Sequence, residues 1–250
     1  MNQSPGTRTL PAALLCALLG TGCLTDPDDA GSRDARIQAR PHTPSASFTI
    51  GTSTIGNASG GTSRIYVPGS YRRDEPMPVV VLLHGAGRTA SEMAGFAGFA
   101  DEHGFILVLP KSNGQTWDVA MGGFGADVDH LNNMLDYVFD RMTVQPGAVA
   151  IGGFSDGASY ALSLGLTNGD LFESVVAFSP GFMQTPERRG KPRVFISHGT
   201  TDAVLPVSNT RNIVESLRGG SYAVRFEEFT GGHTVPPAVA ELAMSWLRDF

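Results

Sequence analysis

The sequence predicts an α/β domain with a mostly parallel sheet that carries helices on both faces. From about Phe48 onward, short apolar runs alternate with stretches in which apolar residues recur at helical spacing. The runs at 79–83 and 105–109 are continuous, which is typical of strands covered on both faces. In such sheets, functional residues are expected beyond the carboxyl ends of the strands.

The elements are expected in a regular order, separated by turn signals such as Pro68-Gly69 and Asn168-Gly169. Strands are predicted at 64–67, 79–83, 105–109, 148–152, 174–178, 193–197 and 222–229. Helices are predicted between them, at 91–103, 128–142, 158–166 and 209–217. Pro236-Pro237 opens a last helix, since proline is tolerated in a first helical turn.

The strand at 148–152 leads directly into Gly153-Phe154-Ser155-Asp156-Gly157, and a helical pattern follows. A serine on so sharp a strand-to-helix turn is held in a strained conformation, with its hydroxyl above the sheet edge. Gly153 and Gly157 flank it because a Cβ at either place would collide as strand and helix close on each other. The pattern indicates the nucleophile elbow of a serine hydrolase; the alternative is a plain glycine-rich turn.

A serine hydroxyl needs a base to take its proton, and the base needs an acceptor that fixes its tautomer. Asp202 follows the strand at 193–197, and His233 follows the last strand. The order Ser155, Asp202, His233 therefore puts one residue of each kind past the carboxyl end of a strand. These three are the predicted catalytic residues.

Each partner of the serine has a plainer alternative. His233 follows two glycines and could be a turn residue, and Asp202 could close an Asx turn or cap a helix. Four other carboxylates compete for the role of the acid: Asp118, Asp170, Glu227 and Glu228. The glutamates alternate faces on their predicted strand and the two aspartates follow the wrong elements, so Asp202 is the expected acid.

Attack on an ester creates an oxyanion, which donors fixed in advance would stabilise. The backbone N–H of Asp156 is one such donor, at the first position of the elbow helix. The second is expected at the N–H of Ala86, in the small-residue segment after the strand at 79–83. His84 is expected to be structural. The Asp156 carboxylate suits a helix N-terminus without any further role.

Three large apolar side chains follow strands on the same sheet edge: Trp117, Phe182 and Met183. They are candidates for lining the acyl or alcohol pocket. Packing of loop side chains is the alternative.

The composition excludes several other classes of function. A net charge of −6 with no run of like charge gives no basic surface for nucleic acid. Both cysteines, Cys16 and Cys23, precede the expected domain, which leaves it without a disulfide, a thiol nucleophile or a cysteine metal site. No metal and no organic cofactor are expected.

Residues 1–23 predict an export signal, because Arg8 precedes an apolar run too short to span a bilayer. Its end at Gly22-Cys23 resembles the lipobox of bacterial lipoproteins, so Cys23 is a candidate lipidation site and the only expected membrane attachment. Ordinary signal cleavage and a disordered apolar tail are alternatives. Residues 24–46 are expected to be a flexible linker and residues 47–250 the catalytic domain. The expected location is the cell envelope or, without lipid, the secreted or periplasmic fraction.

Four segments together resemble α/β-hydrolase-fold esterases: Leu82 to Gly87, Gly153 to Ala158, His198-Gly199 with Asp202, and Gly232-His233. The similar groups are the phospholipase/carboxylesterase family and the esterases related to polyhydroxybutyrate depolymerases and feruloyl esterases. Ala86 stands where the depolymerases often have cysteine, and Asp156-Gly157-Ala158 departs from the Gln-Gly-Gly common in thioesterases.

The resemblance implies a single domain that cleaves carboxylic esters through an acyl-serine intermediate. No large lid is expected, because the connection at 179–191 between two strands is short and its end is charged. The expected substrates are short-chain, polysaccharide or phenolic esters, either small molecules or polymers. A serine peptidase on the same fold is an alternative, as is a non-catalytic binding lipoprotein that keeps the fold.

Overall fold

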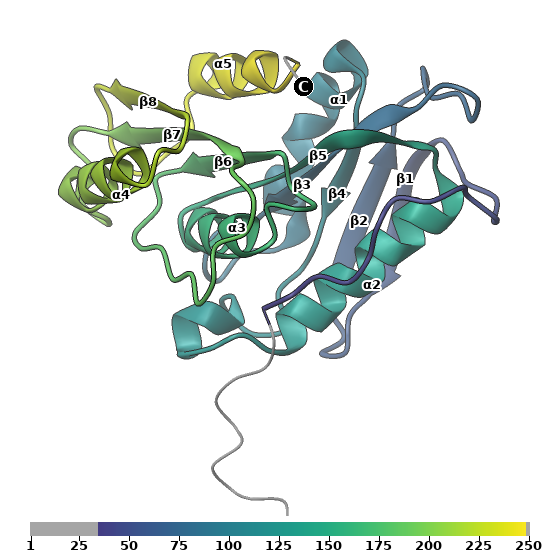
Figure 1. The fold of residues 1–250 in the computed structure, drawn as a ribbon, viewed down its shortest axis with the longest axis horizontal. Helices are drawn as coiled ribbons and strands as arrows, with labels where there is room; N and C mark the ends of the chain where they lie inside the picture. The colour runs from purple at the N-terminus through teal and green to yellow at the C-terminus, as the bar shows by residue number, and fades with distance from the viewer. Residues whose placement is uncertain (1–34, 249–250) are drawn as a thin grey trace, which may run out of the picture. The chain divides into compact units, whose positions relative to one another are not determined.

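The computed structural model describes residues 35–248, which form an eight-stranded sheet in the order β1-β2-β4-β3-β5-β6-β7-β8 (Figure 1). β1 pairs antiparallel with β2, β2 pairs antiparallel with β4, and the remaining neighbours are parallel. The strands span Gly51–Gly56 (β1), Thr62–Val67 (β2), Met77–Leu83 (β3), Ile106–Leu109 (β4), Val144–Phe154 (β5), Ser174–Phe178 (β6), Arg193–Gly199 (β7) and Val224–Phe229 (β8). The prediction of a mostly parallel sheet is confirmed.

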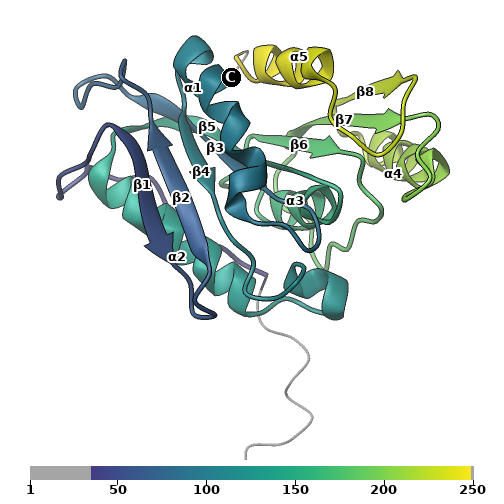
Figure 2. The same ribbon diagram turned by 180° about the vertical axis from the view of Figure 1, so that it is seen from behind.

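Helices cover both faces of this sheet (Figures 1 and 2). The helices are α1 (Ala97–His103), α2 (Ala126–Arg141), α3 (Asp156–Thr167), α4 (Val207–Gly219) and α5 (Pro237–Leu247), with two 3₁₀ turns, η1 (Ala90–Phe96) and η2 (Asp118–Met121). The helix expected at 91–103 is divided between η1 and α1. Gly95 and Gly98 lie in this stretch, and glycine weakens a continuous α-helix.

Two apolar cores form because successive residues of each buried strand point to opposite faces. In β3, Val79, Val81 and Leu83 pack with residues of α2, α3 and α4. Val80 and Leu82 pack on the other face, with residues of η1, α1 and α5. Continuous burial of β3 and β6 follows from this double cover, as their unbroken apolar sequences predict.

The edge strand β1 was not among the predicted strands. Its residues alternate between half-buried and exposed, and Ile55 is its one large apolar side chain. A half-exposed edge strand of Gly, Ser and Thr carries little of the apolar pattern by which strands are recognised.

The expectation of a flexible linker is wrong for residues 35–46, whereas residues 24–34 lie outside the described part. Ala35, Ile37 and Ala39 are buried in the core beside α2 and α3. The N–H of Ile37 donates to Oδ1 of Asn168 (2.9 Å), and Nδ2 of Asn168 donates to the carbonyl of Ala35 (2.9 Å). This extended segment therefore belongs to the folded domain.

Polar contacts anchor the same segment at its flanks. The N–H groups of Gln38 and Ala39 donate to Oδ1 of Asn132 on α2. The Arg36 guanidinium binds both carboxylate oxygens of Asp170, at 2.8 and 2.7 Å, and holds the pKa of Asp170 well below its usual range. Asp170, a rival for the catalytic acid by sequence, thus serves to hold the segment.

Among the helices of residues 35–248, none combines the length and the apolar character needed to cross a membrane.

Replacing Ile37 with alanine tests whether residues 35–46 stabilise the domain. Ile37 is fully buried, so Ile37→Ala should lower the free energy of unfolding by about 2–4 kcal/mol in urea titrations. Ile50→Ala is the matched control, because Ile50 is 47% exposed and its loss should change stability by less than about 0.5 kcal/mol. Equal effects of the two substitutions would contradict the packing of this segment.

Candidate active site

Ser155 lies between the end of β5 at Phe154 and the start of α3 at Asp156, with φ 57° and ψ −120°. A non-glycine residue with positive φ in this region is strained, at a cost of about 1–3 kcal/mol. The turn is held by the N–H of Ser155, which donates to the carbonyl of Phe178 at the end of β6 (2.9 Å). The strain places the Ser155 side chain beyond the carboxyl end of the central strand.

The two flanking glycines are needed for close approach. A Cβ on Gly157 would lie 2.3 Å from the carbonyl oxygen of Leu83 and 2.5 Å from that of His84. A Cβ on Gly153 would lie 2.6 Å from the backbone of Gly157. The first turn of α3 is therefore packed directly against the end of β3, which places the loop after β3 next to Ser155.

Three side chains expected to act together are linked in a hydrogen-bonded series. Nε2 of His233 lies 2.8 Å from Oγ of Ser155, and Nδ1 of His233 lies 2.6 Å from Oδ2 of Asp202. Asp202 comes from the loop after β7, and His233 comes from the loop between β8 and α5. A carboxylate only accepts, so Nδ1 carries the hydrogen and Nε2 is free to accept the serine proton.

Asp202 is held as an anion at the end of this series. Oδ1 accepts the N–H groups of Val204 (2.8 Å) and Leu205 (2.9 Å). Burial raises the pKa of Asp202, but these N–H groups and His233 outweigh it, so its pKa lies below the usual range. The carboxylate therefore stays charged at neutral pH and can stabilise a positive charge that develops on His233.

The loop that carries His233 sits on the end of β7. A Cβ on Gly199 would lie 2.3 Å from the carbonyl oxygen of Gly232, so only glycine permits this approach. On the other side, the ring of Phe154 packs against the imidazole, with centroids 4.8 Å apart. Backbone contact and ring packing together fix where the histidine stands.

Two backbone N–H groups expected to bind an oxyanion flank the serine. The N–H of Asp156 opens α3 and so has no acceptor within the helix. Ala86 follows Gly85, where a Cβ would lie 3.5 Å from Cβ of Ser155. Within residues 35–248, no hydrogen bond is recorded from the N–H of Ala86 or of Asp156.

The loop around Ala86 is fixed at both sides. The N–H of Gly85 donates to Oε2 of Glu92 (2.7 Å), and the N–H of Gly87 donates to the carbonyl of Gln115 (2.6 Å). The Thr116 hydroxyl donates to the Asp156 carboxylate and so joins the loop after β4 to the elbow. Glu92 and Thr116 were not predicted from the sequence, because neither residue lies in a motif and Thr116 is 40 residues from its partner Asp156.

The interpretation of Trp117 as a pocket residue is wrong. Its side chain is fully buried, stacks on Tyr160 with centroids 5.2 Å apart, and donates Nε1–H to the carbonyl of His84 (2.8 Å). Trp117 therefore holds the start of the loop after β3 through its hydrogen bond to His84. Phe182 and Met183 are partly buried at the edge of the core, on the loop after β6.

His84 is structural, as the sequence suggested. It is fully buried, its Nδ1 lies 2.7 Å from the carbonyl of Gly85, and its Nε2 accepts the N–H of Ser112 (3.1 Å). Burial lowers the pKa of His84, which agrees with an accepting, neutral ring. The rival glutamates are engaged elsewhere: Glu228 binds Arg211 and Glu227 binds Arg225.

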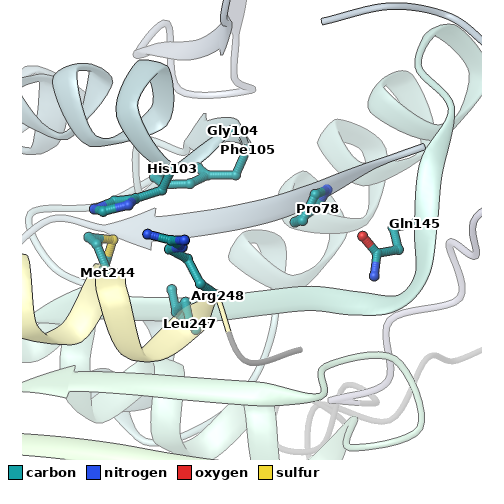
Figure 3. Close-up of a pocket in the computed structure, with 8 residues that line it drawn as sticks. All are labelled: Pro78, His103, Gly104, Phe105, Gln145, Met244, Leu247 and Arg248. Atoms are coloured by element: carbon teal, nitrogen blue, oxygen red, sulfur yellow. The ribbon is translucent and has the colours of Figure 1, made fainter. Parts of the chain in front are cut away.

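A group of possible metal ligands lies apart from this serine site. Among the described residues, Glu102, His103 and Glu241 bring ligand atoms within 4.8 Å of one another, at the end of α1 and on α5. His103 also lines a cavity of about 180 Å³ shown in Figure 3. Pro78 and Gln145, near the amino ends of β3 and β5, line it as well, so it lies at the opposite edge of the sheet from Ser155.

The fold and the serine site define an α/β hydrolase, and comparison with known proteins agrees. The family described as "Putative esterase" matches residues 60–207, more than half of the chain. The chain belongs to this esterase family. The matched region includes Ser155 and Asp202.

Feruloyl esterase B of Thermothelomyces thermophilus is 31% identical over 127 residues, which cover 46% of this chain and 42% of that protein. Acetylxylan esterase A of Talaromyces purpureogenus is 28% identical over 132 residues, covering 49% and 34%. The matches thus span less than half the length of these two relatives. The structure of S-formylglutathione hydrolase from Staphylococcus aureus superposes with a TM-score of 0.65 at 17% identity, over 83% of this chain and 99% of that one, and shows the same fold.

Gly199→Ala tests whether the backbone contact at the end of β7 positions His233. The added Cβ meets two backbone carbonyls and should displace the histidine loop, lowering turnover of an activated ester about 100-fold. Gly232→Ala, in the same loop as His233, places its Cβ in open space, so its kcat and melting temperature should stay close to those of the parent protein. Both variants are compared by kcat and by melting temperature, and equal losses of kcat would contradict the argument.

Proposed function

We propose that the protein hydrolyses carboxylic esters through an acyl intermediate on Ser155. The observation that carries the proposal is the hydrogen-bonded series from Ser155 through His233 to Asp202, built on a strained elbow. Membership of the esterase family supports it independently of that geometry.

In the first half of the proposed reaction, Oγ of Ser155 attacks the ester carbonyl carbon while Nε2 of His233 takes the hydroxyl proton. The N–H groups of Ala86 and Asp156 bind the oxyanion; a donor of this kind contributes on the order of 10²–10³ in kcat. Collapse of the intermediate breaks the bond to the alcohol, which leaves with the proton from His233. The acyl group remains on the serine.

In the second half, His233 takes a proton from water as the water oxygen attacks the acyl carbon. The acid product leaves when His233 returns the proton to Oγ of Ser155. Asp202 stays ionised throughout and stabilises the imidazolium that forms in each half.

Short-chain, polysaccharide or phenolic esters are the proposed substrates. The loop at 179–192 joins β6 to β7 and carries Arg188, Arg189 and Lys191 near its end, so it offers little apolar cover for a long chain. Phe182 and Met183 on this loop are the proposed apolar contacts for the substrate. Relatives named as feruloyl and acetylxylan esterases support an aromatic or acetyl acyl group.

Export and a lipid anchor at Cys23 remain part of the proposal and concern residues outside the described part. Cys23→Ser should release the protein from membranes into the soluble fraction. Unchanged fractionation would favour secretion without lipid or residence in the cytoplasm.

Ser155→Ala should lower kcat for an activated ester by at least about 10⁴-fold, on the order of 5 kcal/mol, because no other group replaces the nucleophile. The same variant should lose covalent labelling by a fluorophosphonate probe. Labelling that persists in Ser155→Ala would reject the serine as nucleophile.

Asp202→Asn should cut turnover about 10³–10⁴-fold, because the amide favours the wrong imidazole tautomer. Glu228→Gln is the matched control: Glu228 pairs with Arg211, so its loss should cost less than about tenfold. The reverse ranking in steady-state kinetics would move the acid to β8.

A graded series of acyl chains tests the proposed substrate class. Each methylene that finds an apolar wall adds about 0.8 kcal/mol of binding, so kcat/KM should stop rising beyond about C6 if the site is open. Acetyl and feruloyl esters extend the series to the acyl groups of the named relatives. A steady rise through C10, or activation at an oil–water interface, would refute an open site.

A further inference from the structure

A second histidine lies against the catalytic acid, and none of the proposed roles uses it. His198 is the penultimate residue of β7, and its side chain is fully buried. Its Nε2 lies 3.2 Å from Oδ2 of Asp202, the same oxygen that lies 2.6 Å from Nδ1 of His233. One carboxylate oxygen thus lies between two imidazole rings.

The partners of His198 determine which nitrogen carries a hydrogen. Nε2 also lies 2.8 Å from the carbonyl oxygen of Leu205. This carbonyl can only accept, so Nε2 bears the hydrogen and donates it to Leu205, while Oδ2 of Asp202 lies beside the same N–H. Nδ1 lies 2.7 Å from the hydroxyl of Thr210, which can donate or accept, so the assignment at Nε2 does not depend on it.

The other side of the ring connects to the loop that carries the proposed substrate contacts. Oγ1 of Thr210, on α4, also lies 3.0 Å from the carbonyl oxygen of Pro180, so the hydroxyl bridges the ring of His198 and the loop after β6. The next residue, Gly181, lies against Leu205: a Cβ on Gly181 would be 3.1 Å from Cδ2 of that leucine. His198 therefore lies between the loop of Asp202 and the loop of Phe182 and Met183.

We propose that His198 is a positioning residue for the proposed hydrolysis: its Nε2–H holds the carbonyl of Leu205, whose own N–H binds Oδ1 of Asp202. The positive end of the same N–H, beside Oδ2 of Asp202, weakens the hold of that oxygen on the positively charged His233. The proposal rests on the proposed function of the serine site. A positive dipole end beside the shared oxygen stabilises its charge and so makes the carboxylate a weaker acceptor toward the second ring. His198 would in this way set how far into acid the site remains active.

Other charged groups near His198 bear on this pH dependence. Glu228 on β8 is paired in register with His198, and Arg211 on α4 binds Glu228 at 2.7 Å. Asp202 lies on the loop after β7, and His233, on the loop after β8, is hydrogen-bonded to it. The Arg211–Glu228 pair is the same in all the variants below, so a difference between His198→Gln and His198→Asn does not come from that pair.

Two substitutions separate the two sides of the ring. His198→Gln places an amide N–H near the position of Nε2 and can still donate to the carbonyl of Leu205 beside Asp202. His198→Asn keeps a polar group near Thr210 but is too short to reach that carbonyl. His198→Asn should lower kcat about tenfold or more with little change in KM, and should move the acid limb of kcat/KM upward by about 0.5–1 pH unit. His198→Gln should restore most of kcat and most of the parent position of the acid limb.

His130→Asn is the control for loss of a buried histidine. His130 is buried on α2, and its Nε2 lies 2.7 Å from Oγ of Ser63, away from Asp202. This variant should lower the melting temperature without moving the acid limb. The role of His198 is rejected if His198→Asn lowers the melting temperature and leaves the acid limb in place, or if His198→Gln and His198→Asn behave alike.

Proton NMR of the hydrogen shared by His233 and Asp202 tests the same contact without turnover. Its resonance should move in His198→Asn and stay near the parent position in His198→Gln. An inert parent protein that is not labelled by fluorophosphonate would refute the proposed hydrolysis, whereas an unmoved resonance in His198→Asn would refute the role of His198 alone.

Discussion

The close contact between α3 and the end of β3 is the constraint on which the rest of the site depends. Gly157 lets the first turn of α3 lie against the carbonyls of Leu83 and His84. Because of this contact, the loop after β3 and the first N–H of α3 face the same space above Ser155. The neighbouring strands β6, β7 and β8 then place their own carboxyl ends beside this space. For this reason His233, 78 positions after the serine, can contact Ser155, and Asp202, 47 positions after it, can contact His233.

Strain at Ser155 is offset by contacts that have no catalytic task of their own. The N–H of Ser155 is bound at the end of β6, and the Asp156 carboxylate accepts the Thr116 hydroxyl. Glu92 binds the N–H of Gly85 and so holds the backbone directly before Ala86. The surroundings thus hold a turn that costs about 1–3 kcal/mol in backbone strain. The site is arranged before any ligand arrives, as electrostatic stabilisation of an oxyanion requires.

The sequence predicted the sheet and the meeting of Ser155, Asp202 and His233 because these depend on local patterns and on chain order. It did not predict that Trp117 points inward, since the direction of a loop side chain depends on distant partners such as Tyr160 and the carbonyl of His84. The segment 35–46 was misread for the same reason. Its backbone N–H groups are hydrogen-bonded by Asn132 and Asn168, which lie about a hundred residues away in the sequence. Its polar composition also obscures the alternation by which Ala35, Ile37 and Ala39 are buried in the core.

The surroundings of Asp202 indicate why this carboxylate, and not a glutamate of β8, suits the role of the acid. Oδ1 accepts two backbone N–H groups, and Oδ2 faces one nitrogen of each of two histidines. A carboxylate held at both oxygens cannot rotate, so the direction of its bond to His233 is set by the loop after β7. Glu228 instead gives both of its oxygens to the Arg211 guanidinium, which leaves neither for His233. Directional control of the base therefore comes from a fully buried side chain held at both oxygens, and His198 contributes by holding the carbonyl of Leu205.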